Sequence, residues 1–308
     1  MISLPLKKLG IGYLMRHSSF SYVNRVMLNI LLVVVVLAVM GSVTRLPAEM
    51  TTLRLGIIPH RSNLGNEQAY SPLIDTLEKQ TGFRINWVGS HSYADVIDKL
   101  GNHTIDLAYM GAFSYVRARE RFDVQLIART LSKDGQAFYL SMIVTHKDSG
   151  LMNLQDLKGK QFAFTDPHST SGYLFPLTAL RKAGVDLDDF SQFNFLKRHA
   201  NSLLAVYNRH VDAGAISSTA PDKVDVDIDQ FRVLWESAPI YRGPWVARKG
   251  LPISTVRQIR SALLNISQSP MADKIFANLG TKGFTVGHDS DYDNIRQVLN
   301  YVEAQTGH

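Results

Sequence analysis

Apolar and polar positions alternate with two periods from residue 51 onward. Short apolar runs, typical of strands, are followed by stretches of about ten residues whose apolar positions lie three or four apart, as in amphipathic helices. In the first half this pattern predicts strands at 51–58, 83–88, 105–109, 124–130 and 137–145, and helices at 70–81, 93–100 and 112–121. In the second half it predicts strands at 161–165, 193–196, 211–216, 231–235 and 244–246, and helices at 172–183, 200–208, 255–268, 271–279 and 291–305.

Strands that alternate with helices are typical of an α/β fold in which parallel sheets are covered on both faces. The pattern runs through two sets of such units, and no low-complexity linker separates them. We therefore predict two α/β lobes joined by crossing strands.

The N-terminal region carries an apolar segment of a different kind. Residues 26–44 contain no charged side chain, and basic residues precede them. Nineteen uncharged residues are close to the length that spans a hydrocarbon core, and a basic flank is typical of an export signal or a membrane anchor. We expect residues 1–48 to be a signal peptide cleaved near residues 41–48 or, if uncleaved, an inner-membrane anchor.

Charge and composition narrow the classes of function. The chain has a formal net charge of +6, but five of its basic residues and none of its acidic residues lie within 1–48. The remaining 260 residues carry 28 basic and 27 acidic side chains, which argues against nucleic-acid binding. The chain has no cysteine, which excludes disulfides, thiolate metal sites and a cysteine nucleophile.

A run of hydroxyl residues is the most informative local feature. Ser169, Thr170 and Ser171 follow the strand predicted at 161–165 and precede the helix predicted at 172–183. One hydroxyl is enough to cap a helix, whereas three hydroxyls beside free amides at the positive end of a helix are suited to bind an anion. The run therefore predicts an oxyanion site, with simple capping as the alternative. His199 lies at a second strand-to-helix edge, where it is either another ligand or a helix-start hydrogen-bonding residue.

Motifs for other chemistry are missing from the sequence. The segment around Ser169 lacks the first glycine of a Gly-x-Ser-x-Gly nucleophile elbow. There is also no P-loop, no dinucleotide-binding glycine pattern and no His-Glu-x-x-His. We expect no enzymatic activity, no metal site and no cofactor.

Several segments together resemble a known family of binding proteins. They are Asp106-Leu-Ala-Tyr-Met-Gly, Thr165-Asp-Pro-His-Ser-Thr-Ser-Gly-Tyr, Arg198-His-Ala-Asn-Ser-Leu-Leu-Ala-Val and Val211-Asp-Ala-Gly-Ala-Ile. They resemble, in unbroken order over about residues 52–290, the periplasmic substrate-binding proteins of phosphate, phosphite and phosphonate ABC transporters.

The resemblance implies a fold and a function. The fold would be a two-lobed periplasmic binding protein of type II with a ligand cleft between the lobes, the first lobe being 52–142 plus 241–308 and the second 143–240. The function would be capture of a small oxyanion outside the cytoplasm by a monomer and its delivery to a membrane permease. The alternative is a membrane-tethered periplasmic sensor domain of the same fold that signals to a partner protein. The resemblance also implies six ligand-binding residues: Tyr93, Tyr139, Ser169, Thr170, Ser171 and His199.

One departure from the family pattern bears on the ligand. Members that bind aminoalkylphosphonates place a carboxylate shortly after the segment that matches Val211-Asp-Ala, and here Thr219 stands at about that position. An ammonium buried without a counter-charge is costly. We therefore expect phosphate, phosphite or a small alkylphosphonate, unless Asp222 supplies the missing carboxylate. Neutral donors and a helix end can bind such a tetrahedral dianion without an arginine.

Overall fold

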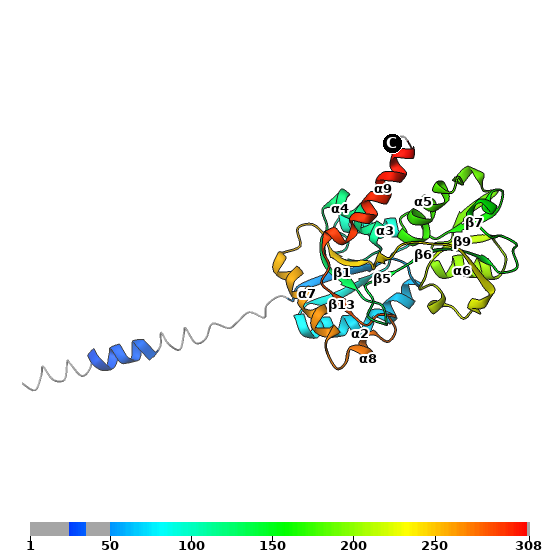
Figure 1. The fold of residues 1–308 in the computed structure, drawn as a ribbon. Coiled ribbons are helices and arrows are strands. Elements are labelled where there is room, and N and C mark those ends of the chain that lie inside the picture. Colours follow the sequence, from blue (N-terminus) through cyan, green and yellow to red (C-terminus); the bar gives the residue numbers. More distant parts are fainter. Residues whose placement is uncertain (1–24, 35–49, 307–308) are drawn as a thin grey trace, which may run out of the picture. The chain divides into compact units, whose positions relative to one another are not determined.

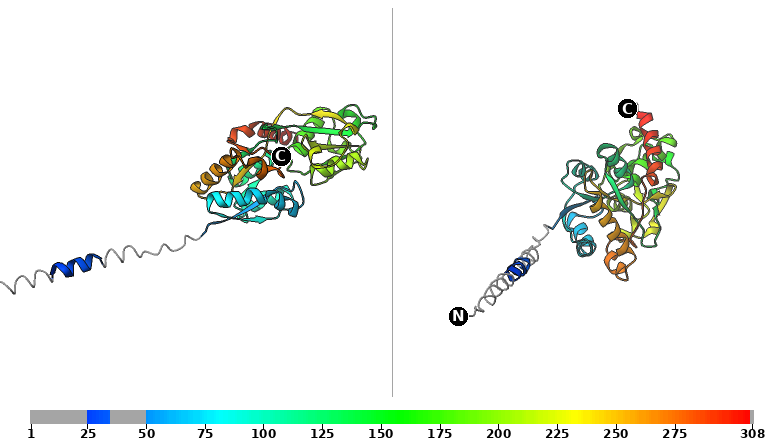
Figure 2. Two further views of the ribbon diagram at one scale, coloured as in Figure 1. Left: turned by 90° about the horizontal axis from the view of Figure 1, so that it is seen from below. Right: turned by 90° about the vertical axis from the view of Figure 1, so that its left-hand side faces the viewer.

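The computed structural model describes residues 25–34 and 50–306, and Figures 1 and 2 show its ribbon from three sides. Residues 25–34 are helical and exposed, and most of the predicted apolar segment 26–44 lies outside the described residues. Within the described ranges, no helix combines the length and the apolar character needed to cross a membrane. Residues from Met50 onward form a compact unit of their own.

The first sheet has six strands in the order β13-β4-β12-β3-β1-β2. Their bounds are Thr52–Ile57 (β1), Arg84–Val88 (β2), Leu107–Tyr109 (β3), Gln125–Thr130 (β4), Pro244–Ala247 (β12) and Phe284–Thr285 (β13). Strand β1 pairs in parallel with β2 and β3, whereas β12 and β13 run antiparallel to their neighbours. The sheet is thus mixed, and the predicted parallel pairing holds for β1, β2 and β3 but not for β12 and β13.

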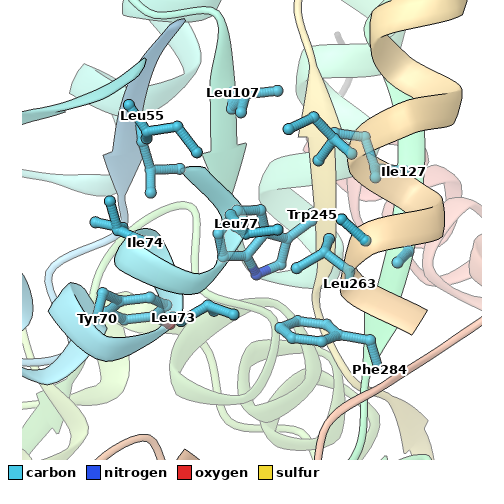
Figure 3. Packing of buried hydrophobic residues seen from close by; sticks show 14 of the residues in the cluster. Leu55, Tyr70, Leu73, Ile74, Leu77, Leu107, Ile127, Trp245, Leu263 and Phe284 are labelled. Carbon is cyan, nitrogen blue, oxygen red and sulfur yellow. The ribbon is translucent and has the colours of Figure 1, made fainter. Parts of the chain in front are cut away.

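Helices cover both faces of the first sheet. One face packs on α2 (Asn63–Thr81), α7 (Ile253–Ser267) and α8 (Ala272–Phe276), and the other on α3 (Tyr93–Gly101), α4 (Ala112–Phe122) and α9 (Asp293–Thr306). Successive strand residues alternate between the two cores, so that Trp245 belongs to the first core and Val246 to the second. Figure 3 shows Trp245 among side chains of α2, α7 and the neighbouring strands.

The second sheet has five strands in the order β10-β6-β9-β7-β8. Their bounds are Ser141–His146 (β6), Gln161–Phe164 (β7), Gln192–Phe195 (β8), Ala213–Ser217 (β9) and Phe231–Glu236 (β10). Strand β7 is parallel to β8 and β9, and β6 is antiparallel to β9 and β10. Helix α5 (Phe175–Lys182) covers one face and α6 (His199–Tyr207) the other. In Figure 1 this sheet and its helices lie to the right of the first sheet.

Two crossing segments connect the sheets. The chain leaves β4 of the first sheet through β5 (Phe138–Tyr139) to β6 of the second, and returns from β10 through β11 (Ile240–Tyr241) to β12. Strands β5 and β11 pair antiparallel as a two-stranded ribbon. The strand predicted at 137–145 is therefore two strands, β5 and β6, and β11 has no counterpart among the predicted elements.

Candidate functional site

A cavity of about 440 Å³ lies between the two sheets. Its walls include the segments that follow β1, β3, β7 and β9, and the carboxyl ends of strands are where α/β folds commonly bind ligands. The cavity is lined by all six residues expected to bind the ligand, namely Tyr93, Tyr139, Ser169, Thr170, Ser171 and His199. The structure thus brings together side chains that are spread over more than 100 residues of sequence.

The hydroxyl run forms the buried start of a helix. Ser169, Thr170 and Ser171 are each at most 2% exposed. The Ser169 Oγ accepts a hydrogen bond from the Gly172 amide at 3.0 Å, so this one hydroxyl caps the π-helical turn Thr170–Leu174 that precedes α5. A Cβ at Gly172 would lie 2.3 Å from the Thr165 side chain, so this close approach requires glycine. Ser169 therefore serves as the helix cap, and the hydroxyls of Thr170 and Ser171 are not needed for capping.

The Thr170 hydroxyl also connects the segment after β7 of the second sheet to the start of α4 beside the first sheet. Its Oγ1 accepts a hydrogen bond from the Phe113 amide at 2.8 Å, at the start of α4. Nearby, the Ser114 hydroxyl donates to the His168 carbonyl at 2.9 Å. In this bond the Thr170 oxygen is the acceptor, so the hydrogen of the same hydroxyl remains available to donate to a ligand.

The hydrogen bonds of His199 assign its protonation state. The Ser217 amide donates to His199 Nδ1 at 3.1 Å, and the Thr165 hydroxyl lies 3.0 Å from the same nitrogen. Burial, followed by the nearby Lys223 charge, lowers the pKa of His199 to about 3. The imidazole is therefore neutral, with its proton on Nε2, which makes it a donor that an oxyanion can use.

Two tyrosines complete the set of neutral donors. Burial raises the pKa of Tyr93, with a smaller contribution from the Asp166 carboxylate. Burial also raises the pKa of Tyr139, against which hydrogen bonding to Ser171 and Thr170 acts. Both phenols therefore keep their protons at neutral pH and can donate hydrogen bonds.

The cavity also contains positive charge that the sequence did not predict. Arg61, Lys133, Lys223 and Arg242 line it, against two acidic residues, Asp134 and Asp222. His60 adds no charge, because burial and then the surrounding cations lower its pKa well below the usual value. Two of these lining residues are arginines, in addition to the neutral donors expected from the sequence. These residues come from separate loops and share no spacing that a sequence pattern could reveal.

The position expected to lack a carboxylate does so. Thr219 lines the cavity, and its hydroxyl lies 2.8 Å from that of Ser217. Asp222 also lines the cavity, but its carboxylate lies 3.4 Å from the Lys133 ammonium, which already supplies a counter-charge. The cleft therefore offers little to a ligand ammonium.

The geometry also bears on catalysis. Among the described residues, Thr165 and His199 form a hydroxyl–imidazole pair, but Thr165 is fully buried and donates to the Ala215 carbonyl at 3.2 Å. The Ser217 amide already occupies the imidazole nitrogen that would act as base. Among the described residues, no group of three or more histidine, aspartate or glutamate side chains is placed to hold a metal ion. The arrangement is suited to hold an anion.

Comparison with known proteins agrees with this geometry. Residues 55–292 match the family described as the periplasmic substrate-binding protein of phosphonate ABC transporters. The phosphonates-binding periplasmic protein of Escherichia coli is 29% identical over 82% of this chain and 77% of its own length. The phosphate-import protein of Mycolicibacterium smegmatis is 28% identical over 82% of this chain and 87% of its own length.

Solved structures show the same fold. A binding-protein component of a phosphonate ABC transporter from Pseudomonas aeruginosa superposes with a TM-score of 0.76 at 25% identity, covering 82% of this chain and 87% of that one. A Prochlorococcus marinus protein in complex with methylphosphonate gives a TM-score of 0.74 at 22% identity, covering 82% and 98%. Since the family match spans most of the sequence, the chain belongs to the family of periplasmic substrate-binding proteins of phosphonate ABC transporters.

Proposed function

We propose that this protein captures a phosphate, phosphite or small phosphonate in the cavity between its two sheets and delivers it to the membrane permease of an ABC transporter. The observation that carries the proposal is the convergence of neutral hydroxyl and imidazole donors in one cavity. In this proposal Tyr93, Tyr139, Thr170, Ser171 and His199 donate to the anion, and Ser169 shapes the turn that presents them.

The energetics support a useful affinity. Each hydrogen bond to a charged group contributes about 1.5–3 kcal/mol. Five such bonds contribute about 7.5–15 kcal/mol, and the upper part of this range exceeds the roughly 8 kcal/mol of a micromolar complex with a margin for the entropy lost on binding. The lining cations add a favourable field for a dianion, which the neutral donors alone would not provide.

The two sheets correspond to the two lobes in this proposal. We assign residues 52–142 and 241–308 to the first lobe and 143–240 to the second, with the β5–β11 ribbon as the hinge. Helix α9 contacts both α4 and α5, so it would bridge the lobes. The family implies a periplasmic location, and residues 1–48 would direct export. The E. coli and M. smegmatis relatives are named as binding or import proteins, which favours transport over a membrane-tethered sensor.

Calorimetric titration of the full-length protein with phosphate, phosphite, methylphosphonate and sulfate tests the proposal. We expect micromolar or tighter binding of at least one of the three phosphorus oxyanions. Absence of binding for all three would contradict it.

A further inference from the structure

The cavity is lined by several cationic groups in addition to the hydroxyls of Ser169, Thr170 and Ser171, which we call the hydroxyl cradle. Arg61 enters it from the segment after β1, Lys223 from the 3-10 turn Pro221–Lys223, and Arg242 from the segment between β11 and β12. The Lys223 side chain is exposed to solvent at the mouth of the cavity. Even so, loss of water around its ammonium, and then the charges of Arg61 and Arg242, lower the pKa of Lys223 to about 8. Like charges have therefore been brought close together in one part of the cavity.

Arg242 has no acidic partner within the part of the chain that the structure describes. Its Nε is buried and has no hydrogen-bond acceptor there, and its guanidinium forms no ion pair with a described residue. Two arginines at the first sheet, by contrast, have a carboxylate partner. Arg54 and Arg248 lie 2.8 and 2.7 Å from the carboxylate of Asp106, which is almost fully buried. Arg242 is half-buried, and leaving its buried Nε–H without an acceptor is costly, which suggests that an anionic group of a ligand completes this site.

The β5–β11 ribbon places Arg242 beside the hydroxyl cradle. Ile240 pairs with Tyr139, and the Arg242 amide donates to the Ala137 carbonyl at 2.9 Å, so the pairing continues past β11. Because side chains alternate along a strand, Arg242 shares a face of the ribbon with Tyr139. Tyr241 faces the other way, with its ring 4.4 Å from that of Phe138. The cationic group therefore neighbours the tyrosine that reaches Ser171 and Thr170.

The cavity has room for more than a bare oxyanion. At about 30 Å³ per water-sized group, an anion of five heavy atoms fills on the order of 150 Å³. This is roughly a third of the 440 Å³ in the cleft. The remaining space lies within reach of cations, and its acidic residues are Asp222, which pairs with Lys133, and the exposed Asp134.

We propose that the cleft selects phosphonates whose alkyl substituent ends in a carboxylate. The phosphonate oxygens would occupy the hydroxyl cradle, and the carboxylate would lie against Arg242 and Lys223. A planar guanidinium presents two parallel N–H groups that match the two oxygens of a carboxylate. This inference rests on the proposed function and narrows its ligand class.

Three ligands with the same two-carbon spacer test the terminal group directly. They are 3-phosphonopropionate, propylphosphonate and 2-aminoethylphosphonate, which end in a carboxylate, a methyl group and an ammonium. Phosphonoacetate against ethylphosphonate repeats the comparison with a shorter spacer. By calorimetry on the full-length protein, at least one carboxylate should bind about tenfold or more tightly than its alkyl counterpart, and the ammonium ligand should bind most weakly. The inference is overturned if neither carboxylate is preferred or if the ammonium ligand binds best.

Variants then assign the preference to its residues. Arg242→Gln and Lys223→Gln should each weaken binding of the carboxylate ligand more than binding of its alkyl counterpart, and so reduce the carboxylate preference severalfold. Arg257→Gln removes one positive charge from an exposed position on α7 and should leave the preference intact. Should Arg242→Gln fail to fold, the exposed Lys223 still decides the question. An unchanged preference in both cleft variants contradicts the assignment. If phosphate, phosphite and alkylphosphonates all fail to bind the parent, the proposed function itself fails; if they bind without a carboxylate preference, only this inference does.

Discussion

The Ser217 amide and His199 Nδ1 form a 3.1 Å hydrogen bond that joins the end of β9 to the start of α6. An amide can only donate, so the imidazole nitrogen must accept and cannot carry a proton in this arrangement. The second ring nitrogen then carries the proton in a cavity-lining residue. The backbone contact thus fixes the tautomer, while burial and then the Lys223 charge lower the pKa of His199 and keep the ring neutral.

The lowered pKa of His199 makes the stability of the fold depend on pH. The folded-state pKa of His199, about 3, lies below the roughly 6.5 of an unfolded histidine, so the unfolded chain binds a proton first as the pH falls. The stabilisation is complete above pH 6.5 and is lost as the pH falls from 6.5 towards 3. Urea unfolding at pH 7, 6 and 5 should show a contribution approaching about 1.4 kcal/mol per pH unit in the lower interval. His199→Gln should reduce this slope, whereas His210→Gln, at an exposed position, should not. Equal slopes in parent and His199→Gln would contradict the assigned protonation state.

The hydroxyl run predicts separable effects for its first two members. Thr170→Ala should weaken methylphosphonate binding by about ten- to a hundredfold, because one hydrogen bond to a charged group is lost. Its melting temperature should also fall by a few degrees, because the buried Phe113 amide loses its acceptor, although Ser169 still caps the helix. Ser169→Ala should lose the cap, at about 1 kcal/mol and roughly 2–4 °C. Thr170→Ser keeps the hydroxyl and serves as the control. Parent-like affinity in Thr170→Ala would remove this residue from the site.

Most of the regular elements could be predicted from the sequence, because their apolar residues are regularly spaced. The predicted helices 93–100 and 112–121 correspond to α3 and α4 within a residue at each end. Helix α2 begins at Asn63 rather than residue 70. Its first turns are polar and contain Gly65, and they are held by the Ser62 cap at 3.1 Å instead of an apolar stripe.

Long-range pairing explains what the sequence pattern missed. Strands β11 and β13 have two residues each, too few to show a period, and they exist because β5 and β4 provide hydrogen-bonding edges. The antiparallel direction of β12 likewise follows from the return crossing and not from its own residues. Arg242 follows β11 directly, so missing that strand also meant missing this cationic group. The hydroxyl run was visible because its members are adjacent in sequence, whereas the lining cations meet only after folding.

Affinity should depend on pH through Lys223. Its ammonium has a pKa of about 8, so it loses its charge as the pH rises from 7 to 9, and an anion in the cleft loses a favourable interaction. Methylphosphonate affinity should then fall by about three- to tenfold beyond any change in the ligand's own charge. Lys223→Arg remains charged throughout and shares the ligand's titration, so it isolates the effect. Identical pH profiles for parent and Lys223→Arg would contradict this role.

The N-terminal region makes a prediction about processing. A basic stretch before the uncharged residues 26–44 is typical of an export signal. Mass spectrometry of protein from a native-like host should detect a mature product that begins near residues 42–50. Intact chain recovered from the membrane fraction would instead support an uncleaved anchor.

The segment that carries Arg242 tolerates no added volume at the next residue. A Cβ at Gly243 would lie 1.9 Å from the Met110 carbonyl oxygen, which belongs to the backbone and cannot rotate away. Gly243→Ala should therefore force the return strand off β3, with a loss of about 1–3 kcal/mol in the free energy of unfolding and a shift of the neighbouring guanidinium. The matched control is Gly111→Ala, where the nearest atom to a Cβ is the Thr170 hydroxyl oxygen at an ordinary 3.7 Å. Denaturant unfolding should show a lower free energy of unfolding for Gly243→Ala than for Gly111→Ala. Titration of Gly243→Ala should show a larger loss of affinity for 3-phosphonopropionate than for methylphosphonate. Parent-like stability and affinity in that variant would mean that the segment bends more easily than its packing against Met110 indicates.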